Sequence, residues 1–414
     1  MHATLVAAAL LSAGALAAQQ PVRSRADSIA KARQDSITLV RELERMRQDT
    51  TKPPMGPQQA PINARLLPDI SAVGDLVGDF SPKGSTQEDV SRFGVREVEL
   101  ALQAAVDPYF RGDVFLGFSD VEGVHIEQAF LTTTAIPGLE ARLGRFLMPV
   151  SKINTTHRHD LHTVEYPWVH QVFFSPEGLK GTGAYASRIF APFGFYQELI
   201  ATVVDRIGEQ PEDLIADEPP NEKLEGMGFS ARWRNYWDLS EASNLEVSAS
   251  GITGRIEQPS AAPLAGGANA FNARQSFFGG DLTYRWRPLE QGLYKSFIAQ
   301  VEFLREVNEQ IDNPLFAGPV RDASGAYAFA RWQLTRRLYL GGRYDWVEDP
   351  FISDATLNAA SGYLELFPSE FSKFILGYER LMPGAPSGTP RPEATNRILL
   401  QASFALGPHK PHPF

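Results

Sequence analysis

Residues 97–107 read EVELALQAAVD, and this stretch decides the fold class. Apolar residues occupy every second position: Val98, Leu100, Leu102, Ala104 and Val106. The positions between them include Glu97, Glu99, Gln103 and Asp107. Successive side chains of a β-strand point to opposite faces, so this period of two predicts a strand with one apolar face and one charged face.

The same alternation recurs from residue 69 to the end of the chain, in segments close to the ~10 residues that a tilted strand needs to span a bilayer. Sixteen such segments begin near residues 70, 93, 109, 124, 139, 183, 195, 224, 243, 274, 294, 325, 337, 354, 370 and 393. Short connections alternate with mostly longer ones, such as 207–223, 257–273 and 309–324. The pattern predicts an all-β protein in which residues 69–414 form a closed antiparallel transmembrane β-barrel of about 16 strands.

A soluble β-sandwich is the alternative, because one polar and one apolar face also describe a sheet that packs on a core. Three features favour the barrel. The second face is charged along most segments, and the even segment count lets the first and last strands pair. Aromatic residues also gather at segment ends, as in the girdles of membrane barrels: Trp233, Tyr236, Trp237, Tyr284, Trp286, Tyr344 and Trp346. No run of eighteen apolar residues follows Asp69, so no transmembrane helix is predicted.

The first 68 residues differ from the rest in composition. Residues 1–18 contain an apolar run and end in small residues, which predicts a secretory signal peptide, although no Lys or Arg precedes the run. Residues 19–50 are predicted to form a periplasmic helix, because 23–49 lack Gly and Pro. Apolar residues seven apart leave open a short coiled coil or a solitary helix. Residues 51–68 contain five prolines and are expected to form a stiff linker.

Residues 144–183 interrupt the alternation with a long irregular stretch, which is usually functional inside a compact domain. Four of the chain's eight histidines lie in it, three of them in the run HRHDLH: His157, His159 and His162. Imidazole beside carboxylate suits zinc, copper or nickel, so these three are candidate metal ligands. The alternative is that they are polar loop residues that face a pore and titrate near neutral pH. No bound cofactor is expected.

Three short motifs carry a resemblance to a known family: EVELALQAAVDP at 97–108, Gly144-Arg145-Phe146 followed by Pro149, and Phe174-Ser175-Pro176-Glu177-Gly178. Over residues 69–414 the chain resembles the phosphate-selective porin superfamily of outer-membrane channels. The resemblance implies a sixteen-stranded barrel, usually trimeric, whose third external loop folds into the lumen as a constriction. By the strand count, that loop is 147–180 in this chain.

The resemblance and the strand count together suggest which residues meet the solute. The constriction is expected at Lys152, His157, Arg158, His159 and His162. The lumen wall is expected to include Glu97, Glu99, Arg111, Asp113, Arg142, Arg232 and Arg234. The family lines its eyelet with lysine and its wall with an arginine ladder. Here the loop offers only Lys152, Arg158 and Lys180, and acidic residues outnumber basic ones on the expected wall, so phosphate selectivity is doubtful.

These features predict an outer-membrane porin: a passive diffusion channel for small hydrophilic solutes or ions, homotrimeric and in contact with outer-membrane lipid. The alternative is an uptake protein for a metal ion or its chelate that uses the loop histidines. Receptors that take up metal chelates with energy from the inner membrane need ~22 strands and a plug domain inside the lumen, and this chain is too short to provide both. The sequence has no GxSxG, no phosphate-binding loop and no dinucleotide fingerprint, so no enzymatic activity is predicted. The net charge of -10 and the lack of a basic stripe argue against nucleic-acid binding.

Overall fold

The computed structural model describes residues 68–407, except 88–90, 120–122, 175–177, 206, 208–226, 260–269, 310–320, 351 and 387. The side chains of residues 256–273 also lie outside the description. The predicted signal peptide, the periplasmic helix and nearly all of the linker fall in residues 1–67, outside the described residues. They remain predictions.

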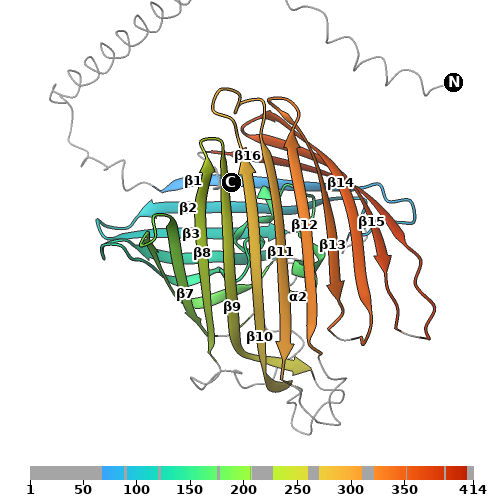
Figure 1. Ribbon diagram of the computed structural model, residues 1–414, viewed down its shortest axis with the longest axis horizontal. Coiled ribbons are helices and arrows are strands. Elements are labelled where there is room, and N and C mark those ends of the chain that lie inside the picture. The colour runs from blue at the N-terminus through green and yellow to red at the C-terminus, as the bar shows by residue number, and fades with distance from the viewer. Residues whose placement is uncertain are drawn as a thin grey trace, which may run out of the picture. The chain divides into compact units, whose positions relative to one another are not determined.

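Sixteen β-strands run through the described residues and close into one antiparallel barrel (Figure 1). The strands are β1 (Asp69–Asp79), β2 (Phe93–Ala105), β3 (Phe110–Ser119), β4 (Gly123–Thr133), β5 (Glu140–Leu147), β6 (Lys180–Phe190), β7 (Tyr196–Val204), β8 (Gly228–Ser240), β9 (Ser243–Pro259), β10 (Ala270–Trp286), β11 (Phe297–Asn308), β12 (Ala323–Gln333), β13 (Leu338–Glu348), β14 (Thr356–Ser369), β15 (Ser372–Pro383) and β16 (Thr395–Leu406). Each strand pairs with its sequence neighbours, and β1 pairs with β16, so the sheet has no open edge. The prediction of a closed barrel of about 16 strands is confirmed.

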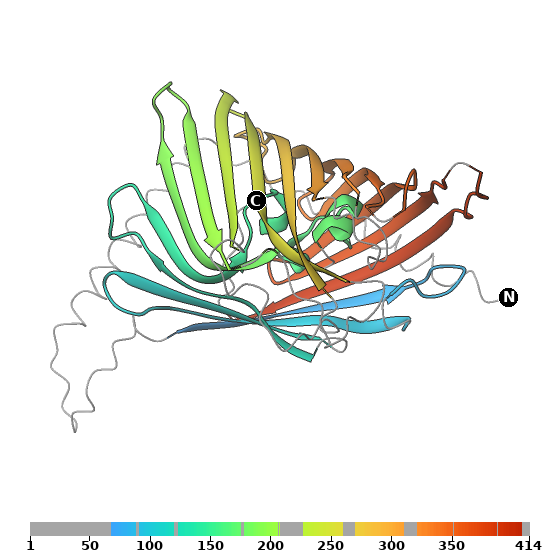
Figure 2. The same ribbon diagram turned by 90° about the horizontal axis from the view of Figure 1, so that it is seen from below.

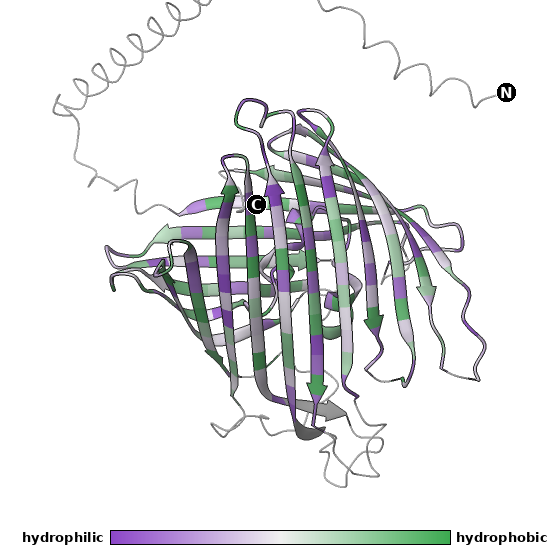
Figure 3. Ribbon diagram, viewed as in Figure 1, coloured by the Kyte–Doolittle hydropathy of each residue, from purple (hydrophilic) through white to green (hydrophobic). Residues whose placement is uncertain are grey.

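The alternation of side chains sets which face of the sheet lies outside. In β16, Gln401 and Ser403 are buried, whereas Phe404 and Leu406 are 41% and 60% exposed. The same rule applies around the barrel, and Figure 3 shows the resulting alternation of polar and apolar residues along the strands. An apolar exterior with a charged interior is the inverse of a soluble protein, and it fits a barrel whose outside contacts lipid.

The hairpin of β9 and β10 is longer than the alternation predicts. Residues 257–273 were expected to form a long connection, but the two strands pair as far as Pro259 and Ala270. Alternation marks only the part of a strand that has one apolar face. Backbone hydrogen bonding continues past that part because it needs no apolar side chains. The prediction of a connection over 257–273 is therefore wrong at both ends.

The segment between β5 and β6, residues 148–179, lies against the inside of the barrel wall; Figure 2 shows its short helix α2 as a green coil within the barrel. We call it the β5–β6 segment. It contains the 3-10 turns η2 (Ile153–Thr155) and η3 (Arg158–Asp160) and the helix α2 (Trp168–Phe174). Helix α2 packs against β12 and β13. Within the described part of the chain, no helix is long and apolar enough to cross a bilayer.

An apolar cluster joins the β5–β6 segment to strands β7 and β9–β13. Met148, Val150, Val169, Phe173 and Phe174 of the segment are all buried. They pack with strand residues of the same cluster, among them Val204, Ile252, Phe277, Leu304, Ala323, Tyr327 and Val347. Burial of a large apolar side chain contributes about 1.5–3 kcal/mol, so these contacts hold the segment inside the barrel by several kcal/mol.

A charge on the outer face should impair assembly of the barrel. Leu376 lies midway along β15, is 49% exposed, and pairs with Leu364 and Leu400 on the neighbouring strands. A charged side chain at the bilayer midplane costs up to about 2–4 kcal/mol, with Asp at the lower end. We expect Leu376→Asp to reduce the heat-modifiable folded form on gels, and Leu376→Ala to retain it. Equal folding of the two variants would mean that this face does not meet lipid.

Candidate functional site

Asn154 ties the two ends of the β5–β6 segment together. Its Nδ2 donates to the carbonyl oxygens of Met148 (2.8 Å) and Leu179 (2.9 Å). Its Oδ1 accepts from the backbone N of Leu179 (2.7 Å) and from Nε2 of His170 (2.9 Å). Burial lowers the pKa of His170 to about 3, so this ring is neutral. The fully buried Asn154 side chain thus makes four hydrogen bonds, each to a group of the segment itself.

Two glycines of the family-like motifs are required by the backbone around this segment. Gly144 of β5 has a φ of 139°, and a Cβ there would lie 2.1 Å from the carbonyl oxygen of Ala129. Gly178 has a φ of 85°, and its Cβ would lie 3.0 Å from Oδ1 of Asn154. Positive φ and close approach both favour glycine, so these positions fix the entry to and exit from the segment.

Arg343 of β13 anchors the middle of the segment to the wall. Its Nε donates to Oδ2 of Asp345 at 2.7 Å, and Oδ1 of Asp345 accepts from the backbone N of Trp168 at 3.0 Å. The guanidinium also donates to three acceptors of the segment: Thr163 Oγ1 (2.8 Å), the Glu165 carbonyl (2.7 Å) and the Tyr166 carbonyl (3.2 Å). Both residues are buried, and Arg343 also lies 3.5 Å from Oε1 of Glu379, so it is Asp345 that depends on Arg343 for its charge to be satisfied.

The Glu165 carboxylate forms a second anchor, at strands β2 and β16. Arg158 of the segment lies 2.8 Å from it, Arg96 of β2 lies 3.4 Å away, and Arg397 of β16 lies 3.7 Å away. Burial alone would raise the pKa of Glu165, but these three cations outweigh burial and lower it to about 2. The carboxylate is therefore charged at all physiological pH values, and it links the segment to the seam where β1, β2 and β16 meet.

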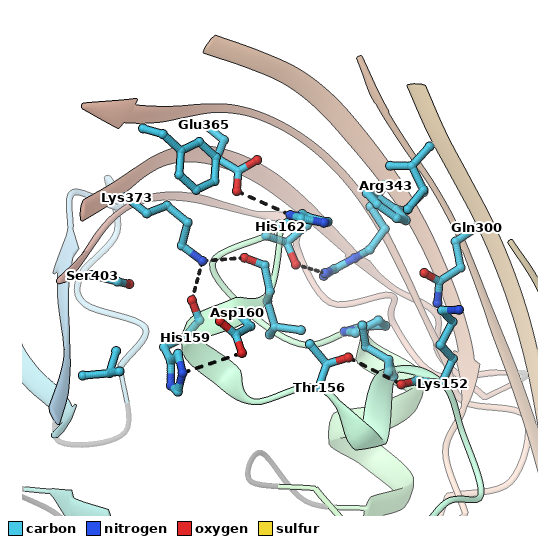
Figure 4. Close-up of a pocket in the computed structure, with 18 of the residues that line it drawn as sticks. Lys152, Thr156, His159, Asp160, His162, Gln300, Arg343, Glu365, Lys373 and Ser403 are labelled. Carbon is cyan, nitrogen blue, oxygen red and sulfur yellow. Dashed lines mark hydrogen bonds and ion pairs between the residues drawn. The ribbon is translucent and has the colours of Figure 1, made fainter. Parts of the chain in front are cut away.

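A third group of contacts holds η3 and the residues after it against β14 and β15 (Figure 4). Lys373 of β15 donates through Nζ to the carbonyl oxygens of His159 and Leu161. Nδ1 of His162 lies 3.4 Å from Oε1 of Glu365, whose other oxygen pairs with Nε of Arg331 at 2.6 Å. Burial, helped by the charge of Arg331, lowers the pKa of His162, so this histidine resists protonation.

His157 and His159 lie together against β2 and β4. Nδ1 of His157 is 2.6 Å from Oε2 of Glu99 and 3.4 Å from Oε1 of Glu127. Nδ1 of His159 is 3.8 Å from the same oxygen of Glu99. Burial alone would lower the pKa of His157, but the two carboxylates raise it well above the ordinary value. Nε2 of His157 lies 2.9 Å from the Gln128 side-chain amide.

Two cavities, each lined by charged and apolar side chains, flank the part of the segment that runs from Lys152 to Asp160. One, of about 240 Å³, lies beside β1 and β10–β16 and reaches the β14–β15 turn. The other, of about 570 Å³, is lined by residues of β1–β10. Four residues line both cavities: Lys152, Thr156, Asp160 and Arg285. The segment therefore divides the space inside the barrel, and these side chains lie at the division.

Lys152 carries the positive charge of the segment at this division. Its Nζ lies 2.5 Å from Oε2 of Glu246, a carboxylate that also pairs with Arg285 at 3.2 Å. Burial lowers the pKa of Lys152 to about 8, although Glu246 opposes this effect. A lysine with this pKa loses its proton within a pH range that bilayer recordings can reach.

Selectivity should depend on pH through Lys152. Between pH 7 and pH 9 the ammonium group passes through its pKa of about 8 and becomes neutral, so the division between the two cavities gains net negative charge and preference for cations should rise. Reversal potentials in a salt gradient measure this shift. Lys152→Arg keeps its charge over the whole range and should remove the shift. A shift of equal size in Lys152→Arg would assign it to another group.

The residues predicted from sequence to line the lumen are distributed around the wall. Glu99 lies in the histidine cluster, and Glu97 lies 4.0 Å from His125. Arg111 pairs with Asp113 at 2.6 Å. Arg142 pairs with Glu140 and lies over the rings of Phe130 and Tyr185. Arg232 pairs with Asp281 at 2.6 Å, and Arg234 with Glu198 at 2.7 Å. Their part in conduction stays a prediction.

Four of the five residues predicted for the constriction line a cavity. Lys152 lines both cavities, His157 lines the larger one, and His159 and His162 line the smaller one. Arg158 instead pairs with Glu165. The three histidines do not form one cluster, since His162 lies beside Glu365 while Glu99 joins His157 and His159.

Sequence reasoning missed Asn154, Glu165 and Glu365. Glu365 was detectable, because it lies between Leu364 and Leu366 on an alternating strand. Asn154 had no signal, because its partners are mostly backbone atoms.

Known proteins similar to this chain agree with the fold. No protein-family model matches the sequence. An uncharacterized protein of Aquifex aeolicus (strain VF5) is 27% identical over 348 residues, which cover 78% of this chain and 70% of the relative. The trimer form of OmpT, an outer membrane protein of Vibrio cholerae, superposes with a TM-score of 0.53 at 9% identity, over 82% of this chain and 99% of that one. OprB of Pseudomonas putida gives 0.51 at 10% identity, over 82% and 94%.

The chain is therefore an outer-membrane β-barrel with a porin-like fold, located in the bacterial outer membrane. The closed sheet and its apolar exterior lead to the same class independently of the similar structures.

Proposed function

We propose that the barrel is a passive diffusion channel for small hydrophilic solutes or ions, with the β5–β6 segment as its constriction. The observation that carries the proposal is the pair of cavities on the two sides of Lys152 to Asp160, each lined by charged side chains as well as apolar ones. A barrel that served only as a scaffold would have no need of cavities with charged side chains on both sides of a segment that is held inside it. The similarity to OprB and OmpT supports the fold of such a channel and says nothing of its solute.

The solute path is proposed to run past Lys152, Thr156, Asp160 and Arg285. One acidic and two basic side chains at the division select less strongly than a single-sign ring does. This mixed charge separates the chain from a strongly phosphate-selective channel, even though its motifs resemble that superfamily. We also propose a homotrimer, which is the usual assembly of that superfamily and the assembly recorded for OmpT of Vibrio cholerae.

Deletion of residues 154–162 tests the constriction. The deletion removes η3, Asn154 and two of the four side chains at the division, Thr156 and Asp160, so single-channel conductance in planar bilayers should rise severalfold and ion selectivity should fall. A deletion of equal length in the β7–β8 connection, residues 211–219, controls for loss of chain. Conductance that is the same in wild type and in the 154–162 deletion would place the solute path elsewhere and remove the constriction from the proposal.

A further inference from the structure

A cluster of two histidines and two glutamates lies where the β5–β6 segment meets strands β2 and β4. Glu99 comes from β2, Glu127 from β4, and His157 and His159 from the segment. All four are buried, with exposed fractions between 2% and 7%. Two carboxylates and two imidazoles offer two oxygen and two nitrogen donors from three separate stretches of chain. This donor set matches the preference of Zn²⁺.

The spacing of the donor atoms also suits a tetrahedral cation. Ligands about 2.0–2.2 Å from a tetrahedral Zn²⁺ lie roughly 3.3–3.6 Å from one another. The separations in the structure bracket that value: 2.6 Å between Glu99 Oε2 and His157 Nδ1, 3.4 Å between Glu127 Oε1 and His157 Nδ1, and 3.8 Å between Glu99 Oε2 and His159 Nδ1. Donor atoms of Glu99, His157 and His159 already lie within 4.8 Å of one another, and a rotation of the Glu127 side chain would add the fourth.

Glu127 supplies an observation that is independent of the donor spacing. Its Oε2 is buried and has no hydrogen-bond partner among the described residues. A buried carboxylate oxygen without a partner is costly, and native proteins rarely leave one. The charge of Lys180 also acts on Glu127, but a cation within the cluster would satisfy the oxygen directly.

We propose that Glu99, Glu127, His157 and His159 form a binding site for one divalent transition-metal ion of the Zn²⁺ type. The ion joins η3 of the segment to the wall at β2 and β4, a position separate from the anchors at Arg343 and Glu165. Binding through Nδ1 of His157 leaves the other ring proton on Nε2. The Gln128 amide nitrogen now faces Nε2 of His157 at 2.9 Å, and the amide oxygen accepts from the backbone N of Leu147 at 3.1 Å, so metal binding through Nδ1 requires the Gln128 side chain to shift.

Zn²⁺ binding to the purified full-length barrel tests the site. The protein is produced without a polyhistidine tag and with His409→Gln and His412→Gln, so that the tail adds no ligands. It is stripped with a chelator in detergent and titrated calorimetrically with ZnCl₂. We expect one Zn²⁺ per chain. His157→Gln and Glu99→Gln should each weaken binding at least about 10–100-fold, the loss that removal of even a supporting partner causes.

Two variants serve as matched controls. His125→Gln removes a histidine of the same strand as Glu127 that lies near Glu97 instead, and it should leave Zn²⁺ affinity unchanged. His162→Gln separates this site from one built on the histidine run. An affinity loss in His162→Gln equal to that in His157→Gln would overturn the proposal, as would binding that persists unchanged in the His157→Gln/His159→Gln double variant. Zinc-edge X-ray absorption of the loaded barrel should show two imidazole ligands.

The calorimetric Zn²⁺ titration tests the metal site independently of the proposed channel function. Binding is measured in detergent and does not require conduction, so a barrel that binds Zn²⁺ but does not conduct would refute the channel and keep the site. A conducting barrel that binds no Zn²⁺ would refute the site alone. Heat-modifiable migration of every variant shows that the barrel is folded. If His157→Gln fails to fold, the near-isosteric Glu127→Gln tests the same site.

Discussion

Replacement of Arg343 by methionine is expected to release the β5–β6 segment and raise single-channel conductance. The change leaves Asp345 buried without its cation and removes the donor from two carbonyl oxygens of the segment. Loss of one partner of a buried ion pair costs about 3–5 kcal/mol. That is comparable with the burial of two large apolar side chains, so the inward position of the segment should no longer be strongly favoured.

Limited proteolysis and bilayer recording measure the release together. Trypsin should cut after Arg158 in Arg343→Met and spare it in the wild type, where Arg158 is held by Glu165. The barrel itself should remain heat-modifiable, because strand pairing does not involve this side chain. Arg343→Lys keeps the charge but loses the forked geometry, and we expect an intermediate effect.

The double variant Arg343→Met/Asp345→Asn tests whether the unpaired buried charge of Asp345 causes the release of the segment. The Asn at position 345 keeps an acceptor for the backbone N of Trp168 and removes the unpaired charge. Part of the protection of Arg158 from trypsin should therefore return. Protection no better than in Arg343→Met alone would mean that the hydrogen bonds to the segment, and not the buried charge, carry the effect.

Most of the barrel is encoded locally, which is why sequence alternation predicts it. A lipid-facing strand has to show apolar residues at every second position, and the sixteen predicted starts lie within four residues of the observed ones, as in 224 against Gly228 and 274 against Ala270. The wrong ends predicted for the connection between β9 and β10 also follow from this dependence on alternation. Where these strands continue as a paired ribbon, the alternation gives no information on backbone pairing.

The β5–β6 segment is held by contacts between distant parts of the chain. Its sequence therefore shows which polar residues it contains, but not which wall residues they contact. The run HRHDLH suggests one metal site, yet the wall supplies a carboxylate from β2 to His157 and a different one from β14 to His162. Which wall residue meets which histidine depends on the path of the segment across the barrel. That path follows from Arg343, Glu165 and Asn154, whose partners are far away in the sequence, as Arg397 is from Glu165, or are backbone atoms.

Asn154→Asp is expected to release the β5–β6 segment by breaking the contacts that join its two ends. The expected rise in conductance and in proteolysis is close to that of Arg343→Met. The substitution keeps shape and Oδ1, but it replaces the Nδ2 donor by a carboxylate oxygen that faces the carbonyl oxygens of Met148 and Leu179. Each buried carbonyl left without its donor costs about 1–3 kcal/mol, and the new charge adds to this in a fully buried position.

The pH dependence of this variant separates lost hydrogen bonds from lost packing. A protonated carboxyl can donate to one of the two carbonyls, so the inward state binds a proton more tightly than the released state does, and inward packing should strengthen as pH falls. Protection of Arg158 from cleavage in Asn154→Asp should therefore recover partly at pH 5 relative to pH 8, measured with a protease active at both values. Asn154→Ala has no proton to gain and should show no recovery beyond that of the wild type. Equal recovery in Asn154→Ala would show that Asn154 acts by filling space and that its four hydrogen bonds do not hold the segment in place.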